Sequence, residues 1–167
     1  MNNSPHPVND TFIRPATPHD SDAIIAVAVA SGIFPAEETE MLETVLSDHF
    51  AGNGGGHVCV LEEEGVPVAV AYYTPAVAAD RTWDLTMIAV RPERQRQGYG
   101  ATLLGYMETA LRGSGQRLLL VDTSGLPEYE SARAFYAKQG FEREARIRDF
   151  YADGDDKIVF RKSLRVS

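Results

Sequence analysis

The stretch IAVRPERQRQGYGA, residues 88–101, carries the strongest structural signal in this chain of 167 residues. Three apolar residues end a predicted strand, arginines follow, and Gly98 and Gly100 precede an apolar pattern at helical spacing. At such a junction, backbone N–H groups lie next to the positive end of the helix dipole. A glycine lets an anion approach these amides because it has no side chain. The stretch therefore predicts a pyrophosphate site that needs no metal.

Two common nucleotide sites do not fit this loop. It lacks the Lys-Ser/Thr pair of a P-loop and the three-glycine spacing of a Rossmann site. Glycines that end a loop before a helix are often purely structural, and that interpretation stays open here. The preceding strand residues and Gln95 make the pattern more specific.

Working outward from the loop, the sequence predicts a mixed α/β chain with one sheet. We expect helices through 24–28, after Pro35, and over 101–112 and 131–139. The helix after Pro35 has an apolar stripe of Met41, Leu42, Val45 and Leu46. The nearly continuous apolar run of 117–122 predicts a strand buried on both faces. The predicted strands are 11–15, 57–62, 66–73, 82–90, 117–122, 141–151 and 157–164.

Length and composition favour one domain over residues 11–167, preceded by a flexible tail at 1–10. The contents of 44% hydrophobic and 24% charged residues are ordinary for a soluble globular protein. A single cysteine, Cys59, excludes an internal disulfide framework and a cysteine-based metal cluster. No run reads as a signal peptide or a membrane span, so we expect a cytoplasmic protein.

Charge is distributed unevenly along the chain. Residues 1–90 hold 13 acidic and 2 basic residues, a net of −11, and residues 91–167 hold 14 basic and 11 acidic, a net of +3; together these give −8. The overall negative charge argues against a general nucleic-acid binder, because phosphate affinity comes from clustered Lys and Arg. One half could suit a cationic partner and the other an anionic one, or the charges only solvate helix faces.

Two motifs resemble those of the GCN5-related N-acetyltransferase (GNAT) family. The acetyl-CoA signature Gln/Arg-x-x-Gly-x-Gly/Ala is matched by QRQGYG, residues 95–100. The downstream pattern Ala-x-x-x-Tyr-x-x-x-Gly-Phe is matched by ARAFYAKQGF, residues 132–141. The order of elements also fits, so the resemblance covers nearly the whole chain. Its C-terminal half is most similar to the ribosomal-protein alanine acetyltransferase subgroup.

The resemblance implies the GNAT acyl-CoA N-acyltransferase fold, with a central mixed sheet of about seven strands flanked by about four helices. It also implies acetyl-CoA as cosubstrate, without a metal. The family often has an Asn seven residues before the motif tyrosine, but here this position is Tyr129, so Ser131 or Glu130 is expected to supply the contact. The implied cofactor-binding residues are Ile88, Ala89, Val90, Gln95, Arg96, Gln97, Gly98, Tyr99, Gly100, Ala101 and Ser131.

Acyl transfer to an amine needs a proton acceptor for the amine and a proton donor for the departing thiolate. The resemblance places Asp84 on the central strand where family members often carry a carboxylate, and it places Tyr136 near the thioester sulfur. Asp84 is the expected base, directly or through water, and Tyr136 the expected acid. The Val90 amide would stabilise the oxyanion. The alternatives are a strand-end Asp84 and a Tyr136 that only packs in the core.

Other chemically capable side chains give weaker signals. Cys59 lies in an apolar run, which is typical of a buried small hydrophobe. The four histidines, among them His49 and His57, match no metal or triad spacing. Tyr72 and Tyr73 must face opposite sides of their strand, so one of them could line an acceptor site.

The expected function is therefore N-acetylation of a primary amine, of a small molecule or a protein, by direct attack in a ternary complex. Glu37, Glu38, Glu40 and Glu43 favour a cationic acceptor, because the region they occupy shapes acceptor access in the family. We expect no nucleic-acid or membrane partner, and a homodimer is possible. The alternative is a non-catalytic acyl-CoA-binding sensor.

Overall fold

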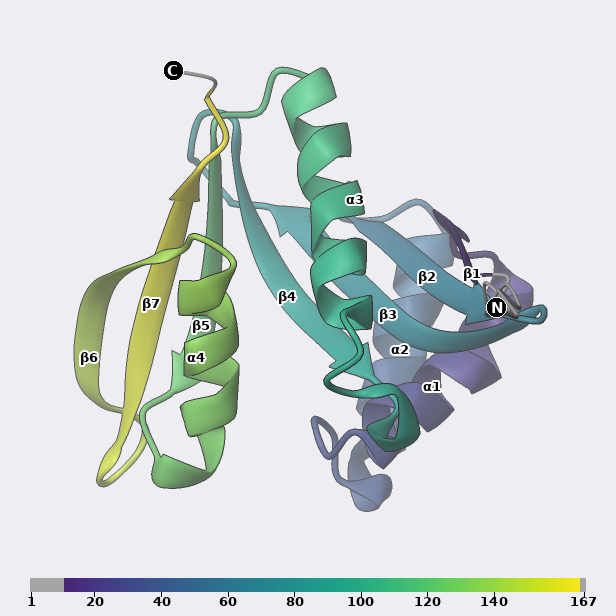
Figure 1. The fold of residues 1–167 in the computed structure, drawn as a ribbon, viewed down its shortest axis with the longest axis horizontal. Helices are drawn as coiled ribbons and strands as arrows, with labels where there is room; N and C mark the ends of the chain where they lie inside the picture. The colour runs from purple at the N-terminus through teal and green to yellow at the C-terminus, as the bar shows by residue number, and fades with distance from the viewer. Residues whose placement is uncertain (1–10, 166–167) are drawn as a thin grey trace, which may run out of the picture. The chain divides into compact units, whose positions relative to one another are not determined.

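The apolar runs of the sequence form one mixed sheet with four α-helices in the computed structural model, which describes residues 11–165. The predicted tail at 1–10 lies outside the described residues. The strand order is β1-β2-β3-β4-β5-β7-β6, which confirms the expected fold class (Figure 1). The strands are β1 (Thr11–Pro15), β2 (His57–Glu63), β3 (Val66–Pro75), β4 (Thr82–Val90), β5 (Leu118–Ser124), β6 (Glu142–Ala152) and β7 (Asp155–Ser163). The helices are α1 (Ser21–Ala30), α2 (Thr39–Phe50), α3 (Tyr99–Gly113) and α4 (Glu130–Lys138), with short 3-10 turns η1 (Pro18–Asp20), η2 (Ala36–Glu38), η3 (Pro92–Arg94) and η4 (Pro127–Tyr129).

The described residues group into two compact units. The first unit comprises residues 11–72 and 87–106, and the second comprises 73–86 and 107–165. The strands β3 and β4 and the helix α3 each contribute residues to both units. The expectation of a single domain over 11–167 stays a prediction.

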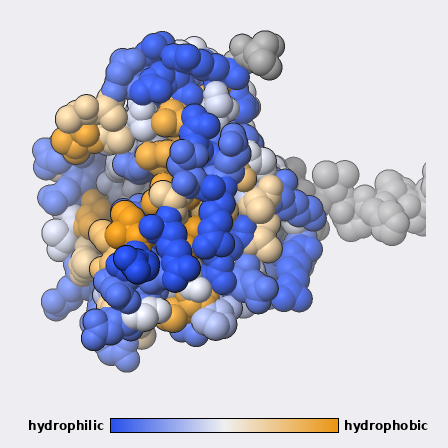
Figure 2. Space-filling model, turned by 90° about the vertical axis from the view of Figure 1, so that its left-hand side faces the viewer, coloured by the Kyte–Doolittle hydropathy of each residue, from blue (hydrophilic) through white to orange (hydrophobic). Residues whose placement is uncertain are grey.

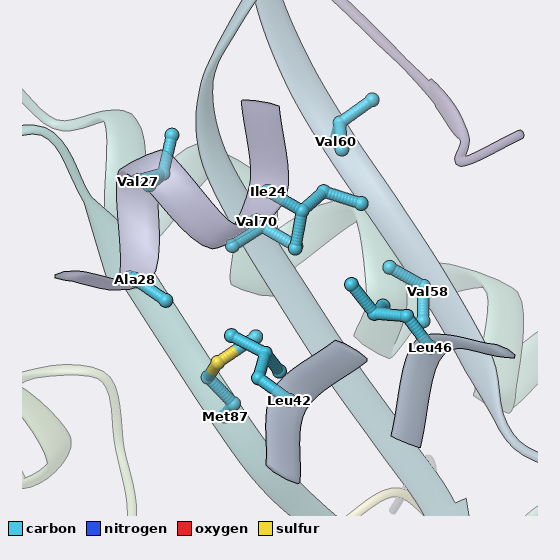
Figure 3. Packing of buried hydrophobic residues seen from close by; sticks show 10 residues of the cluster. Ile24, Val27, Ala28, Leu42, Leu46, Val58, Val60, Val70 and Met87 are labelled. Carbon is cyan, nitrogen blue, oxygen red and sulfur yellow. The ribbon is translucent and has the colours of Figure 1, made fainter. Parts of the chain in front are cut away.

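The core of the first unit forms where α1 and α2 pack on the sheet. Apolar residues at helical spacing, including Ile24, Val27 and Leu46, are almost fully buried (Figure 3). They meet Val58 and Val60, which alternate along β2 and so share one face. Met41 was expected in the apolar stripe of α2, but it is 53% exposed, so this part of the stripe prediction is wrong. Leu42 and Leu46 of the same predicted stripe are buried, as expected.

The other face of β2 is covered as well. Cys59 and Leu61 are buried although they point away from α1 and α2. Figure 1 shows α1 and α2 behind the strands of this unit and the beginning of α3 in front of them. Both faces of β2 are therefore buried between Val58 and Leu61.

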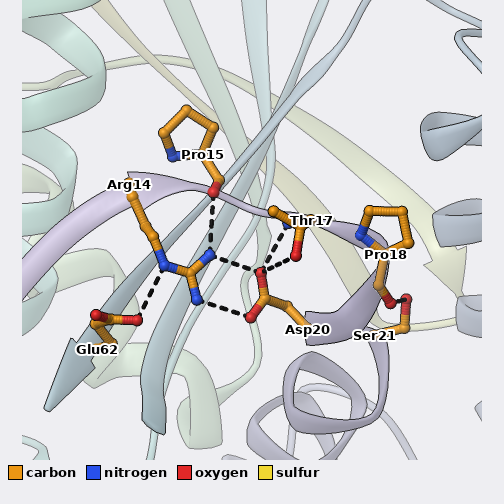
Figure 4. A network of polar contacts seen from close by, with 7 residues as sticks. All are labelled: Arg14, Pro15, Thr17, Pro18, Asp20, Ser21 and Glu62. Carbon is orange, nitrogen blue, oxygen red and sulfur yellow. Dashed lines mark hydrogen bonds and ion pairs between the residues drawn. The ribbon is translucent and has the colours of Figure 1, made fainter. Parts of the chain in front are cut away.

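An ion-pair network fixes the start of α1 (Figure 4). The Asp20 carboxylate accepts two hydrogen bonds from the Arg14 guanidinium, at 2.7 and 2.9 Å, and one from the Thr17 N–H at 2.7 Å. Arg14 also donates to Glu62 of β2 at 2.9 Å. The hydrogen bonds from Arg14 and Thr17 hold the pKa of Asp20 at about 2. The network joins β1, β2 and the first turn before α1.

In the second unit, β5 pairs in parallel with β4 and antiparallel with β7, which in turn pairs with β6. Only one face of β5 is fully covered: Leu119 and Val121 are buried, whereas Leu118 and Leu120 are partly open and Asp122 is exposed. The prediction that this strand is buried on both faces is therefore wrong. A continuous apolar run cannot show by itself which face is left open.

All residues of β6 are exposed, and they include the large apolar side chains of Ile147, Phe150 and Tyr151. Figure 2, seen from the side of Figure 1 on which β6 is drawn, shows a hydrophilic surface broken by hydrophobic patches. No helix within residues 11–165 combines the length and apolarity that a membrane crossing requires.

Candidate active site

The loop between β4 and α3 is shaped by its own glutamine side chains. Gln95 Nε2 donates to the carbonyl of Val90 at 3.0 Å, and Gln97 Nε2 donates to the carbonyl of Glu93 at the same distance. Arg96 and Gly98 both have positive φ, 61° and 85°. These features turn the chain sharply between the strand and the helix, and turns of this kind can form an anion-binding concavity of successive backbone N–H groups.

Six backbone N–H groups in this loop have no acceptor. Among residues 11–165, the amides of 96–101 make no hydrogen bond to the protein, and the first helical bond runs from Thr102 to Gly98 at 2.9 Å. A Cβ built at Gly98 would meet no atom within 4 Å, so the space in front of the loop is open. Unsatisfied amides at a helix N-terminus beside open space fit a phosphate group.

The strand residues before the loop present their backbone. Ala89 is buried in the first core, and Ile88 and Val90 are half-buried. The Arg91 N–H bonds to the Val68 carbonyl of β3 at 2.9 Å. Because neighbouring N–H groups along a strand point to opposite edges, the Val90 N–H points away from β3. This orientation leaves it available to a ligand.

Tyr99, Gly100 and Ala101 lie in the first turn of α3, which begins two residues before the predicted start. The Tyr99 hydroxyl donates to Glu63 at 3.1 Å, so its side chain is directed toward β2 and only its amide is left for an anion. Nothing in the local sequence singled out Glu63. Its contacts with Arg94 and Tyr99 span 31 and 36 residues of chain.

Asp84 lies in the second unit, on the half-open face that it shares with Leu120 and Asp122. The parallel register sets Asp84 opposite Leu120, so Asp122 is two residues further along the same face. Lys157 of β7 forms an ion pair with Asp122 at 3.1 Å. Burial, and next the negative charge of Asp122, raise the pKa of Asp84, while Lys157 lowers it. A carboxyl with a raised pKa is a stronger base than an exposed aspartate.

Tyr136 lies on α4 and is buried among aromatic rings. Its ring centroid is 5.5 Å from that of Phe135, 5.7 Å from Phe141 and 5.8 Å from Phe160. Burial raises the pKa of Tyr136 to about 12, so its hydroxyl is protonated at neutral pH. Within the described part of the chain, this hydroxyl has no hydrogen-bond partner. The ring position is therefore fixed while its proton can be donated to another group.

The start of α4 carries the other expected contact. Ser131, Glu130 and Tyr129 are all exposed there, and the Ser131 side chain makes no hydrogen bond to another described residue. Arg133 anchors this end of the helix by donating to the carbonyls of Ser124 and Leu126 at 2.7 and 2.9 Å. The assignment of Ser131 to the cofactor stays a prediction.

The weaker candidates lie in packed surroundings. Cys59 is buried, which raises the pKa of its thiol to about 12 and keeps it protonated. As expected, the two tyrosines of β3 face opposite sides: Tyr73 packs on Trp83, and Tyr72 lies against the His49 ring. No group of three or more His, Cys, Asp or Glu side chains within 11–165 is arranged to hold a metal.

Comparisons with known proteins agree on the class of fold. The model of the acetyltransferase (GNAT) domain matches residues 54–143. A solved structure from Desulfovibrio desulfuricans, described as a GNAT-family acetyltransferase, is 34% identical with a TM-score of 0.88, and the match covers 93% of this chain and 99% of that one. No curated protein matches the sequence.

More distant structures share the same fold. The ribosomal-protein-S18-alanine N-acetyltransferase of Escherichia coli is 22% identical with a TM-score of 0.77, covering 94% of this chain and 96% of that one. A Salmonella typhimurium structure described as an acetyltransferase with its cofactor acetyl-CoA is 19% identical with a TM-score of 0.72, covering 95% and 96%. These structures show that the chain has the same α/β fold. The family match goes further, and this chain belongs to the GNAT family of acetyltransferases.

Proposed function

We propose that this chain transfers the acetyl group of acetyl-CoA to a primary amine by direct attack in a ternary complex. The row of six unsatisfied amides at 96–101, which overlaps the family signature of residues 95–100, carries the proposal. In it, these amides hold the pyrophosphate, and the backbone of 88–90 binds the pantetheine arm. Bound acetyl-CoA supplies the thioester carbonyl that the amine attacks.

The Val90 N–H is the oxyanion donor of the proposed reaction. The Val90 N–H points away from β3, as the bond from Arg91 to Val68 requires. A fixed backbone donor stabilises negative charge on a carbonyl oxygen without reorganising during the reaction. Because the donor is a backbone N–H, this role requires no particular side chain.

Asp84 and Tyr136 are the proposed groups for the two proton transfers. Asp84 accepts the proton of the attacking amine, directly or through one water, which its raised pKa favours. Tyr136 donates its phenolic proton to the departing thiolate, and the packed aromatic rings hold the phenol in one orientation. Both assignments are part of the proposal.

The acceptor in this proposal is a cationic amine, of a small molecule or of a protein. Glu37, Glu38, Glu40 and Glu43 lie along η2 and α2, and all four are exposed. Their negative charges would attract an alkylammonium group and raise its local concentration. A cytoplasmic location and a homodimer stay predictions of the sequence.

The test is acetyl transfer by the purified chain. Acetyl-CoA is incubated with polyamines, amino acids and peptides that carry a free N-terminal amine, and free thiol and N-acetylated product are both measured. The proposal predicts equal amounts of the two with at least one amine. Stabilisation of the chain by CoA without product from any amine would overturn it and indicate a non-catalytic acyl-CoA sensor instead.

A further inference from the structure

The last residue of β2, Glu63, contacts the loop between β4 and α3 at Arg94, just before the family signature, and at Tyr99, within it. Arg94 Nε, in η3, donates to one Glu63 carboxylate oxygen at 2.6 Å. The Tyr99 hydroxyl, in the first turn of α3, donates to the other oxygen at 3.1 Å. One carboxylate of β2 therefore binds the two residues that flank 95–98.

The Glu63 carboxylate is well protected from water. Its side chain is 9% exposed, compared with 36% for the side chain of Arg94. A carboxylate this buried is stable only when charged or hydrogen-bonding partners satisfy its oxygens. Charge-assisted hydrogen bonds of this kind are short and directional, so they restrict the positions of both partners.

The other bonds of the loop are local or lie at its first residue. Gln95 bonds to Val90, Gln97 bonds to Glu93, and the Arg91 N–H bonds to Val68 of β3. The contact with Glu63 attaches Arg94 and Tyr99 to β2, which is buried on both faces between Val58 and Leu61. Local bonds thus shape the loop, and Glu63, distant in the sequence, attaches the loop beyond Arg91 to the sheet.

We propose that Glu63 is a positioning residue, which holds Arg94 and Tyr99 so that the amides of 96–101 are arranged for the pyrophosphate before CoA binds. This inference rests on the proposed function of the loop. A loop ordered in advance loses less conformational entropy on binding. Weakening the contact should therefore reduce affinity for CoA and leave the chemical step at saturation nearly unchanged.

The test compares Glu63→Gln with Glu64→Gln. Both remove one negative charge, but Glu64 is an exposed residue of the β2–β3 turn. Removing a negative charge near an anion site should by itself improve CoA binding. A loss of affinity in Glu63→Gln alone is therefore specific to positioning.

We expect Glu63→Gln to raise the Kd for CoA and the KM for acetyl-CoA about tenfold, the scale of one charge-assisted hydrogen bond. Its kcat should stay within about twofold of the parent value, and Glu64→Gln should bind CoA at least as well as the parent. Tyr99→Phe removes one of the two contacts with little change in volume, and we expect about a threefold effect. Equal Kd values in the parent, Glu63→Gln and Tyr99→Phe would overturn the inference.

A measurement without ligand separates this inference from the proposed function. Amide hydrogen exchange of 95–101 should be faster in Glu63→Gln than in the parent, and unchanged in Glu64→Gln. Unchanged exchange in Glu63→Gln would contradict positioning whether or not the chain binds CoA. If the parent does not bind CoA, the proposed function fails even where exchange in the loop responds to Glu63.

Discussion

Tyr136 has two possible roles, and its surroundings allow both to be tested with one substitution. The ring is buried among Phe135, Phe141 and Phe160. The hydroxyl is protonated at neutral pH, as phenols are, and burial raises its pKa further, to about 12. The sequence motif identifies Tyr136 as the candidate tyrosine. The motif cannot distinguish a general acid from a core-packing residue, since both roles require an aromatic ring at this position.

Tyr136→Phe keeps the ring and removes only the proton donor. If Tyr136 is the acid, kcat should fall by roughly 10²-fold, at the low end for general acids because CoA is a fairly good leaving group. Thermal stability and the KM for acetyl-CoA should change little. The deficit should shrink with an acyl donor whose thiol is more acidic. Full kcat in steady-state kinetics would show that Tyr136 is a packing residue.

Asp84 is tested through the pH dependence of turnover. If Asp84 accepts the proton, Asp84→Asn should lose most activity at low pH and less at high pH, where free amine is already present. The raised pKa of Asp84 should move the acidic limb of the parent's kcat/KM profile above that of an ordinary aspartate. Parallel pH profiles for the two proteins would remove Asp84 from the mechanism.

The stability of the same variant gives an independent check of the Asp84 environment. A carboxyl whose folded-state pKa is raised binds its proton more tightly in the folded protein than in the unfolded one. Its contribution to stability therefore falls as the pH rises from its unfolded-state pKa through its folded-state pKa. Asp84→Asn should therefore be at least as stable as the parent at pH 7 to 8 in thermal unfolding. A clear loss of stability there would show that the ionised carboxylate is needed for folding.

At the scale of elements, the strand and helix patterns predicted the chain well, and the differences have physical reasons. The helix α3 starts at Tyr99 because the Gly98 carbonyl accepts the first helical bond, whereas glycines had been assigned to the loop. The open face of β5 and the exposure of Met41 depend on which neighbouring elements cover them, and local periodicity does not contain that information.

The start of α1 offers a stability test at this scale. Asp20→Asn should lower the free energy of unfolding by about 2 kcal/mol at pH 7, since it removes the charge that Arg14 and Thr17 bind. Because the pKa of Asp20 is depressed to about 2, this contribution is complete above the unfolded-state pKa near 4 and fades as pH falls toward 2.

Denaturant unfolding at several pH values checks this prediction. The exposed neighbour Asp22 provides the matched control, and Asp22→Asn should change stability much less. Equal losses in the two variants, or a loss in Asp20→Asn that does not fade in acid, would contradict the account of this network.

At the scale of the whole molecule, two motifs in order were enough to predict the family and the fold. Residues 95–100 and 132–141 carry the signatures. The predicted order of helices and strands between and around them also agreed with the fold of the family. The sequence could not predict Glu63, because its partners are brought to it only by the packing of β2 against the loop region. Nor could it predict the raised pKa of Asp84, which results from burial and from Asp122 on the neighbouring strand β5, against the opposing effect of Lys157 on β7.

The account depends most on the claim that the amides of 96–101 hold the CoA pyrophosphate. Calorimetric titration of CoA into Gly98→Glu tests it, with Gly115→Glu as the control. Both glycines have positive φ, 85° and 78°, and a Cβ at either would meet nothing within 4 Å, so the backbone strain and the added charge are matched. We predict that Gly98→Glu weakens CoA binding about 100-fold or more by repulsion and bulk, whereas Gly115→Glu binds like the parent. A Gly98→Glu variant with the parent's affinity would contradict the claim.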